Sequence, residues 1–444
     1  MARILYWNIQ QFGVNKIRML GLKRNHAGVL QPDYEAQDRR QLILRHITSF
    51  NPDIFVVIEV ATGANAGSSL LTQTGGWDGC NLLRQQLAGL PGAPQWNLVP
   101  PLVVGMGGRA EAVAIYYKRT TNAGNSLYFT GPNQWSNLGN GQTFNPGVMP
   151  APLRAAYPAP FNAACYPNGS RAIPAGTLHN TGIQENQCAA RVNFVDGGGA
   201  AINYNGLRSP YMATFSEING GGVIVQDISL FAVHSPPNHT AQNYLNGLAN
   251  VGDISAALGA NEARVIVGDF NLNLLNNGNN ANNYYNNLTA LGYAKQLDPA
   301  GGPPVPLDGY QGYFTTHIKN AANSSFWSTN AGNIFYPGYN YLGSSMVNNF
   351  YSIDNILVRG GAPNNFTVSN SVTGTPLNIV PGPVPGAPPL GNVAFPSSFQ
   401  NPPGGWPANP APQFQLGDNQ RYRDWRNYGH IRSTSDHLAL YVEV

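Results

Sequence analysis

The chain has 444 residues and a formal net charge of +3, and its composition excludes several classes of protein. Hydrophobic residues make up 42% of the sequence, which is enough for a large core and argues against intrinsic disorder. The net charge is too small to indicate a nucleic-acid partner, so any evidence for one has to come from local clusters of basic residues. Three cysteines are too few for a disulfide scaffold, although Cys165 and Cys188 could either pair or remain free thiols.

The N-terminus and the apolar runs carry no membrane or export signal. No apolar run reaches the length that a membrane span needs. Met1, Ala2 and Arg3 lead straight into a strand-like run, without the pattern of a signal peptide. We therefore expect a protein without a membrane span that is cytoplasmic, exported by a non-classical route, or represented here in a trimmed form.

Short apolar runs bounded by polar residues recur along the chain and predict strands of a buried sheet. They lie at 4–7, 53–58, 112–117, 228–233, 264–267, 353–358 and 438–442. Helical periodicity predicts one helix over about 36–50, with His46 on its apolar face, and another over about 240–258. Strands with helices between several of them are typical of a layered α/β protein.

Two long stretches, 119–207 and 360–432, lack this regular pattern. Both are rich in Gly and Pro, and the first is also rich in Asn. Loops of this length are uncommon inside compact domains. We interpret the two stretches as insertions on one domain that spans residues 1–444.

Polar side chains that can bind metals or transfer protons stand at the ends of the apolar runs. Asn8, Glu59, His234, Asp269 and Asn271 follow runs, while Asp436 and His437 precede the last one. Strand ends meet at one rim of a sheet, where α/β folds place ligand sites. The oxygen ligands favour Mg²⁺, Mn²⁺ or Ca²⁺ over zinc. A hard metal with two imidazoles that titrate near neutral pH suits the hydrolysis of a phosphate ester.

The order of several short motifs resembles that of the endonuclease/exonuclease/phosphatase superfamily, and most closely that of deoxyribonuclease I. The matching segments are 8–13, 58–60, 111–118, 208–210, 234–237, 268–271, 352–357 and 435–437. Gly268-Asp269-Phe270-Asn271 and Ser435-Asp436-His437 are the most recognisable of them. Each motif alone is only moderately specific, and their common order carries the resemblance.

The resemblance implies a four-layer α/β/β/α sandwich of the deoxyribonuclease I-like type, with the active site at one edge. It implies a metal site of Glu59, Asn8, Asp269, Asn271 and Asp436. It further implies catalytic roles for His234 with Glu111 and for His437 with Asp354, with Asp269 and Asn271 taking part. In each pair the carboxylate would fix the tautomer of the imidazole. Arg208 would contact the substrate phosphate.

The leading hypothesis is a divalent-metal-dependent endonuclease that hydrolyses DNA, with RNA as the other nucleic-acid candidate. His437 would be the general base and His234 the general acid, or the reverse. The alternative is a phosphodiesterase or phosphatase on a lipid or small substrate, such as sphingomyelin or a phosphoinositide. Phosphoinositide phosphatases usually carry Cys-Asp-Arg where this chain has Ile353-Asp354-Asn355. A non-catalytic binding protein on the same scaffold is disfavoured, because every expected chemical residue is present.

Two basic clusters are candidates for substrate binding. Lys16, Arg18, Lys23 and Arg24 follow the Asn8 motif. Arg421, Arg423 and Arg426 alternate with aromatic residues shortly before Asp436. Arginine interleaved with aromatic rings suits phosphate backbones and stacked bases.

Replacing Arg421, Arg423 and Arg426 together by glutamine should weaken DNA binding and flatten its dependence on salt. Fewer counterions are released on DNA binding when phosphate contacts are lost, so the affinity depends less on salt. Binding isotherms at several salt concentrations test this hypothesis, and an unchanged affinity and salt slope would refute it.

Overall fold

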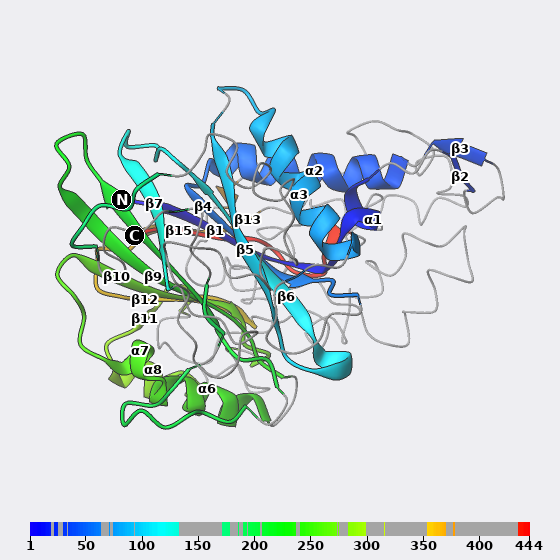
Figure 1. Cartoon of the computed structure of the whole chain (residues 1–444). Coiled ribbons are helices and arrows are strands. Elements are labelled where there is room, and N and C mark those ends of the chain that lie inside the picture. Colours follow the sequence, from blue (N-terminus) through cyan, green and yellow to red (C-terminus); the bar gives the residue numbers. More distant parts are fainter. Residues whose placement is uncertain are drawn as a thin grey trace, which may run out of the picture.

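Two mixed β-sheets packed face to face, each with helices on its outer side, make up the fold of this computed structural model (Figure 1). The structure describes residues 1–18, 22–24, 30–32, 34–63, 71, 74–92, 94–132, 171–177, 185, 190–192, 194–204, 207–236, 240–272, 274, 283–298, 315, 353–369, 376–377 and 434–444. Helices α2 and α3 cover the first sheet, and α6, α7 and α8 lie on the opposite side, against the second sheet. The expected four-layer α/β/β/α class is confirmed.

The first sheet has the strand order β14-β13-β15-β1-β4-β6-β5. Its strands are β1 (Arg3–Phe12), β4 (Ile54–Val60), β5 (Trp96–Val104), β6 (Glu111–Lys118), β13 (Asn364–Ser369), β14 (Pro376–Leu377) and β15 (Leu440–Glu443). The second sheet has the order β11-β12-β10-β9-β8-β7. Its strands are β7 (Ser126–Gly131), β8 (Tyr211–Ile218), β9 (Ile224–His234), β10 (Glu262–Asp269), β11 (Ala294–Lys295) and β12 (Asp354–Arg359).

The helices and a small hairpin complete the described elements. The helices are α1 (Val14–Ile17), α2 (Tyr34–Phe50), α3 (Thr74–Ala88), α6 (Thr240–Asn250), α7 (Gly252–Ser255), α8 (Asn286–Ala290) and the 3₁₀ turn η1 (Gly107–Arg109). Strands β2 (Leu22–Arg24) and β3 (Leu30–Pro32) pair with each other as a separate hairpin. Within the described part of the chain, no helix is both long and apolar enough to cross a membrane.

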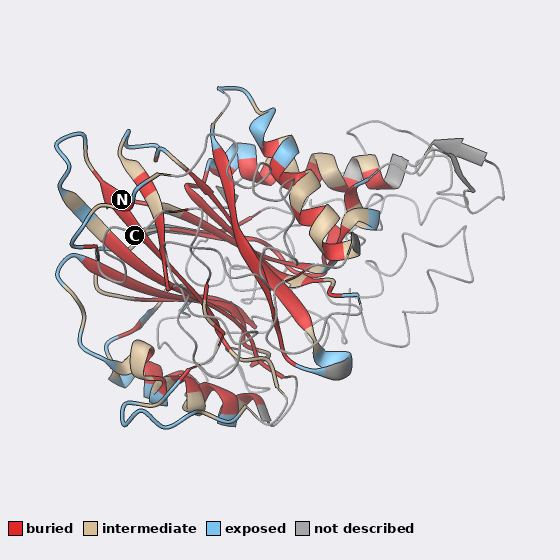
Figure 2. Ribbon diagram, in the orientation of Figure 1, coloured by how far each residue is buried: buried red, intermediate tan, exposed pale blue. Residues whose placement is uncertain are grey.

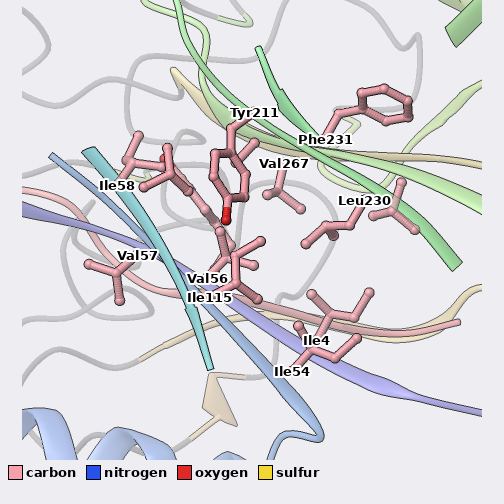
Figure 3. Close-up of a cluster of buried hydrophobic side chains, with 14 of the residues drawn as sticks. Ile4, Ile54, Val56, Val57, Ile58, Ile115, Tyr211, Leu230, Phe231 and Val267 are labelled. Atoms are coloured by element: carbon pink, nitrogen blue, oxygen red, sulfur yellow. The ribbon is translucent and has the colours of Figure 1, made fainter. Parts of the chain in front are cut away.

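The core lies between the two sheets and is built from the apolar runs of the sequence. Strands of both sheets are buried along most of their length (Figure 2). Ile4, Val56 and Ile115 from the first sheet face Leu230 and Val267 from the second (Figure 3). Burial on both faces explains why these strands read as continuous apolar runs and not as alternating patterns.

Pairing within each sheet directs polar strand ends to one edge of the sandwich. β1 runs parallel to β4, and β9 runs parallel to β10 in a register that places His234 beside Asp269. The antiparallel neighbour β12 begins where β10 ends, so Asp354 pairs with Asp269. The ends of the parallel strands and the beginnings of the antiparallel strands therefore lie at the same edge of the sandwich.

Each of the predicted strand runs falls in or overlaps an observed strand, and the helix expected near 36–50 is α2. The helix expected over 240–258 is instead divided into α6 and α7, because Val251 between them has an extended backbone. The stretches 119–207 and 360–432 are not loop throughout: β7 lies in the first, and β13 and β14 lie in the second. These are short strands flanked by turn residues, so periodicity did not reveal them.

Cys165 and Cys188 lie outside the described residues, while Cys80 is a buried free thiol.

His46 lies on the buried face of α2, as its sequence position predicted. Its side chain is fully buried, its ring centroid is 4.3 Å from that of Trp7, and its Nδ1 is 2.8 Å from the Leu42 carbonyl oxygen. Burial lowers the pKa of His46 from 6.5 to about 4. The folded state therefore holds this imidazole neutral at pH values where the unfolded chain protonates it.

His46 should make the fold sensitive to mild acid. Because its pKa is lower in the folded state, its contribution to stability is complete above pH 6.5 and is lost as pH falls toward 4. The loss between pH 7 and pH 5 should be about 2 kcal/mol. Urea unfolding at both pH values should show His46→Phe losing clearly less stability than the wild type. An equal loss in the two proteins would show that His46 does not titrate in this way.

Candidate active site

Four strands from the two sheets bring Asn8, Glu59, His234 and Asp269 to the same edge of the sandwich. Asn8 and Glu59 lie toward the carboxyl ends of β1 and β4, and His234 and Asp269 end β9 and β10. Across the sandwich, β1 approaches β10 and β4 approaches β9. The site is therefore assembled at the junction between the sheets.

Asn8 links the two sheets through its carboxamide. Its Nδ2 donates to Glu59 Oε1 at 3.0 Å and to Asp269 Oδ2 at 3.4 Å. Its Oδ1 is buried and accepts no hydrogen bond. A buried acceptor without a donor is costly, and a cation at this point would satisfy it.

The backbone at two of these positions departs from ordinary strand geometry. Glu59 has a φ of +59°, where the pairing of β4 with β6 shifts register between Val57 and Val60. Asn271 has a φ of +51°. Residues other than glycine rarely adopt this left-handed region, and such conformations cluster at functional sites.

Gly268 shows how closely the neighbouring strands β9 and β10 approach each other beside the site. A Cβ atom at this position would lie 2.1 Å from the carbonyl oxygen of Val233. Only glycine fits there without a backbone shift, which gives the first residue of Gly268-Asp269-Phe270-Asn271 its physical role. Asn271 closes the same turn, because its backbone N–H donates to Asp269 Oδ1 at 2.8 Å and its Nδ2 donates to the Ser235 carbonyl at 2.9 Å.

The first histidine, His234, is paired with Glu111 at the start of β6. Its Nδ1 lies 3.0 and 2.8 Å from the two carboxylate oxygens of Glu111. Arg208 Nε lies 2.7 Å from Glu111 Oε2 as an ion pair without good hydrogen-bond alignment. Burial by itself lowers the pKa of His234, but the charge and hydrogen bond of Glu111 outweigh it and raise this pKa to about 9.

The second histidine, His437, is paired with Asp354 at the start of β12. Its Nδ1 lies 2.8 Å from Asp354 Oδ2, and both side chains are buried. Burial alone lowers the pKa of His437, but the nearby carboxylates of Asp354 and Asp269 raise it well above its usual value. Each imidazole thus turns Nδ1 to its own carboxylate and leaves Nε2 for the centre of the site.

Asp269 occupies that centre. Its Oδ2 is 3.6 Å from Nε2 of His234 and 3.6 Å from Nε2 of His437. Burial and the Asp354 carboxylate raise the pKa of Asp269, although the two imidazoles oppose the rise. A buried carboxylate is costly to hold as a lone negative charge, and a bound cation beside Asp269 would offset that cost.

Among the residues that the structure describes, two groups of side chains place potential metal-ligand atoms within 4.8 Å of one another: Glu59, His234 and Asp269, and Asp269, Asp354 and His437. Asp354 in the second group is already hydrogen-bonded to His437 and to Tyr6. The first group contacts the carboxamide of Asn8, whose Oδ1 is unsatisfied, and supplies carboxylate oxygens, which suit a hard divalent cation. The residues present therefore fit such an ion beside Glu59, Asp269 and Asn8.

The structure brings most of the predicted site residues into one neighbourhood. Together at this edge are Asn8, Glu59, Glu111, Arg208, His234, Asp269, Asn271, Asp354, Asp436 and His437. Asp436 Oδ1 lies 3.9 Å from His437 Nε2, the most distant of these contacts. Arg421, Arg423 and Arg426 lie outside the described residues, so their predicted role in substrate binding stays a prediction.

Lys16, a member of the other basic cluster, contacts the backbone on both sides of the site. Its Nζ donates to the carbonyl oxygens of Gln10 and Thr434, the latter at 2.7 Å. It thus ties the segment after β1 to the segment that carries His437. Its role in substrate binding stays a prediction.

Sequence reasoning missed the residues that support the second histidine. Tyr6 donates its hydroxyl to Asp354 Oδ1 at 2.9 Å, and Trp7 Nε1 donates to the His437 carbonyl at 2.8 Å. Ser435 Oγ accepts the His437 backbone N–H at 2.9 Å. Tyr6 stands two residues before Asn8, and alternate strand residues share a face. That spacing was the available signal.

Comparisons with known proteins give likenesses of fold only. No family model and no curated protein matches the sequence. An endonuclease/exonuclease/phosphatase family protein from Leptotrichia buccalis is 10% identical, with a TM-score of 0.40, covering 100% of this chain and 99% of that one. D. rerio TDP2 complexed with a single-strand DNA product is 11% identical, with a TM-score of 0.37 and coverages of 100% and 99%.

A mannosyl-6-phosphatase from Bacteroides thetaiotaomicron is 10% identical, with a TM-score of 0.33, covering 83% of this chain and 87% of that one. Identities and TM-scores this low carry no information about activity. Two of the similar solved structures are named as endonuclease/exonuclease/phosphatase proteins.

Proposed function

We propose that this chain is a divalent-metal-dependent phosphodiesterase of the endonuclease/exonuclease/phosphatase superfamily, built as one domain over residues 1–444. One observation carries the proposal. His234 and His437 each bind a carboxylate through Nδ1 and each hold Nε2 3.6 Å from the same oxygen of Asp269. Two oriented imidazoles around an acidic centre can deliver and remove protons on either side of a phosphate.

Glu59, Asp269 and Asn8 would hold the metal ion, with Asn271 and Asp436 beside them. When bound, a hard divalent ion stabilises the negative charge that develops on the phosphoryl oxygens. Arg208 lies next to Glu111 on the His234 side of the site. From there its guanidinium would bind a non-bridging phosphate oxygen, the kind of contact for which arginine is well suited.

The two histidines would divide the proton transfers. Asp354 and Glu111 keep Nδ1 as the donor to a carboxylate, so Nε2 is the nitrogen that exchanges protons. The positive charge of Arg208 opposes the rise in the pKa of His234. Of the two possible assignments, we propose His437 as the base that takes a proton from water and His234 as the acid that protonates the leaving oxygen.

DNA is the substrate that we propose, with endonucleolytic cleavage. The support comes from the sequence: the local motifs are closest to the nuclease branch, and Arg421, Arg423 and Arg426 precede Asp436 among aromatic residues. These arginines would bind the phosphate backbone on either side of the scissile bond.

Incubation of the protein with supercoiled plasmid and Mg²⁺ or Mn²⁺ should give nicked and then linear DNA. Cleavage should stop with EDTA, and His234→Ala should lower its rate by about 10²- to 10⁴-fold, the usual effect of losing a general acid. Glu443→Gln is the matched control, because this carboxylate lies on β15 and contacts Arg3, Asn365 and Tyr441 away from the site. Absence of cleavage with every divalent metal would refute the DNA assignment and direct the search to sphingomyelin and phosphoinositides.

A further inference from the structure

We infer that Tyr6 is a positioning residue for the second histidine, acting through Asp354 as the outer member of a Tyr6–Asp354–His437 chain. This inference rests on the proposed function for its kinetic consequence, but its geometry is independent of any substrate. Tyr6 donates to Asp354 Oδ1 at 2.9 Å, and His437 Nδ1 lies 2.8 Å from Asp354 Oδ2. The carboxylate thus divides its two oxygens between the phenol and the imidazole.

Burial makes this division of the oxygens important. Tyr6 and Asp354 are fully buried, and His437 is 4% exposed. A buried carboxylate needs hydrogen-bond donors to offset the loss of water. A tyrosine hydroxyl is a neutral donor at ordinary pH. With Oδ1 bound to Tyr6, the orientation of the carboxylate is fixed and Oδ2 remains directed at His437.

The rest of the surroundings hold this chain in place. The backbone N–H groups of Ile353 and Asp354 both donate to Thr315 Oγ1, at 3.1 and 3.0 Å. Trp7, the next residue after Tyr6, donates to the carbonyl of His437. Strand β1 therefore holds the Asp354–His437 pair through Tyr6 and Trp7. Through Asn8 the same strand links the carboxylates of Glu59 and Asp269. Rigid support of this kind is what a proton-transfer group needs.

The Glu111–His234 pair has a different outer partner, and comparing the two pairs shows what Tyr6 contributes to the Asp354–His437 pair. Glu111 presents both oxygens to His234 Nδ1, and its outer partner is the cation Arg208. Arg208 belongs to a segment before β8 and remains partly exposed, whereas Tyr6 lies inside the sandwich. Arg208 is placed to meet a substrate phosphate. Tyr6 is fully buried against Asp354, so it is placed to orient that carboxylate and not to contact a substrate.

The direct test is the nitrogen-bound proton of His437, observed by NMR in metal-free protein labelled with ¹⁵N-histidine. The resonance is identified by its loss in His437→Gln. Tyr6→Phe should move it, because Oδ1 loses its donor and the carboxylate is free to rotate. Tyr211→Phe is the matched control: Tyr211 is equally buried, and its hydroxyl contacts the Pro100 carbonyl instead. A resonance unmoved by Tyr6→Phe, or moved equally by Tyr211→Phe, would overturn the inference.

Kinetics provide the second test. Tyr6→Phe should lower kcat for plasmid cleavage about tenfold, the usual consequence of losing one hydrogen bond to a charged group. KM and Mn²⁺ affinity should stay unchanged, since Arg208, Glu59 and Asn8 are untouched. Incorporating 3-fluorotyrosine at position 6 keeps the hydroxyl and should restore kcat. A loss confined to KM or to metal affinity would contradict a positioning role. If the wild type cleaves no DNA, the proposed function fails while the NMR result still decides the role of Tyr6.

Discussion

The site depends on a buried carboxylate, Asp269, placed between two imidazoles at the junction of two β-sheets. Its Oδ2 lies 3.6 Å from both Nε2 atoms and 3.4 Å from the amide of Asn8. Charges buried this closely are costly unless they are paired. The two imidazoles and the amide of Asn8 offset part of the cost of burying the charge of Asp269.

That arrangement follows from strand direction. β1 and β4 run parallel, as do β9 and β10, so their carboxyl ends reach the same edge of the sandwich. Antiparallel β6 and β12 start at this edge and supply Glu111 and Asp354. Each imidazole thus receives a carboxylate from the first residue of a strand in the opposite sheet. Gly268 permits the close approach of β10 to β9 that this register requires.

The sequence predicted which polar residues lie close together better than it predicted some of the strands around them. Buried strands produce continuous apolar runs, and their polar ends mark the site, so Glu59, His234 and Asp269 could be found without coordinates. Strands such as β7 are short and bounded by turn residues, and β5 contains two consecutive prolines, Pro100 and Pro101, so neither gives a clear strand pattern.

The contact between Tyr6 and Asp354 could not be predicted from the sequence, which shows only that Tyr6 shares a strand face with Asn8. Tyr6 and Asp354 are 348 positions apart, and only the packing of β1 against the second sheet brings them within hydrogen-bonding distance. Lys16 shows a related limit, because the sequence marked it as part of a basic cluster and gave no sign that its Nζ binds two backbone carbonyls. Local patterns identify candidate residues, while the contacts that fix their roles come from the tertiary structure.

The central claim is that Glu59, Asp269 and Asn8 form one cation site between the two histidine pairs. Crystals soaked in Mn²⁺ and measured at a wavelength where manganese scatters anomalously would test it most directly. We predict an anomalous peak within coordination distance of Glu59 and Asp269, with the Oδ1 of Asn8 turned toward it and both Nδ1 contacts intact. A peak elsewhere, or none at a saturating Mn²⁺ concentration, would contradict this account of the site.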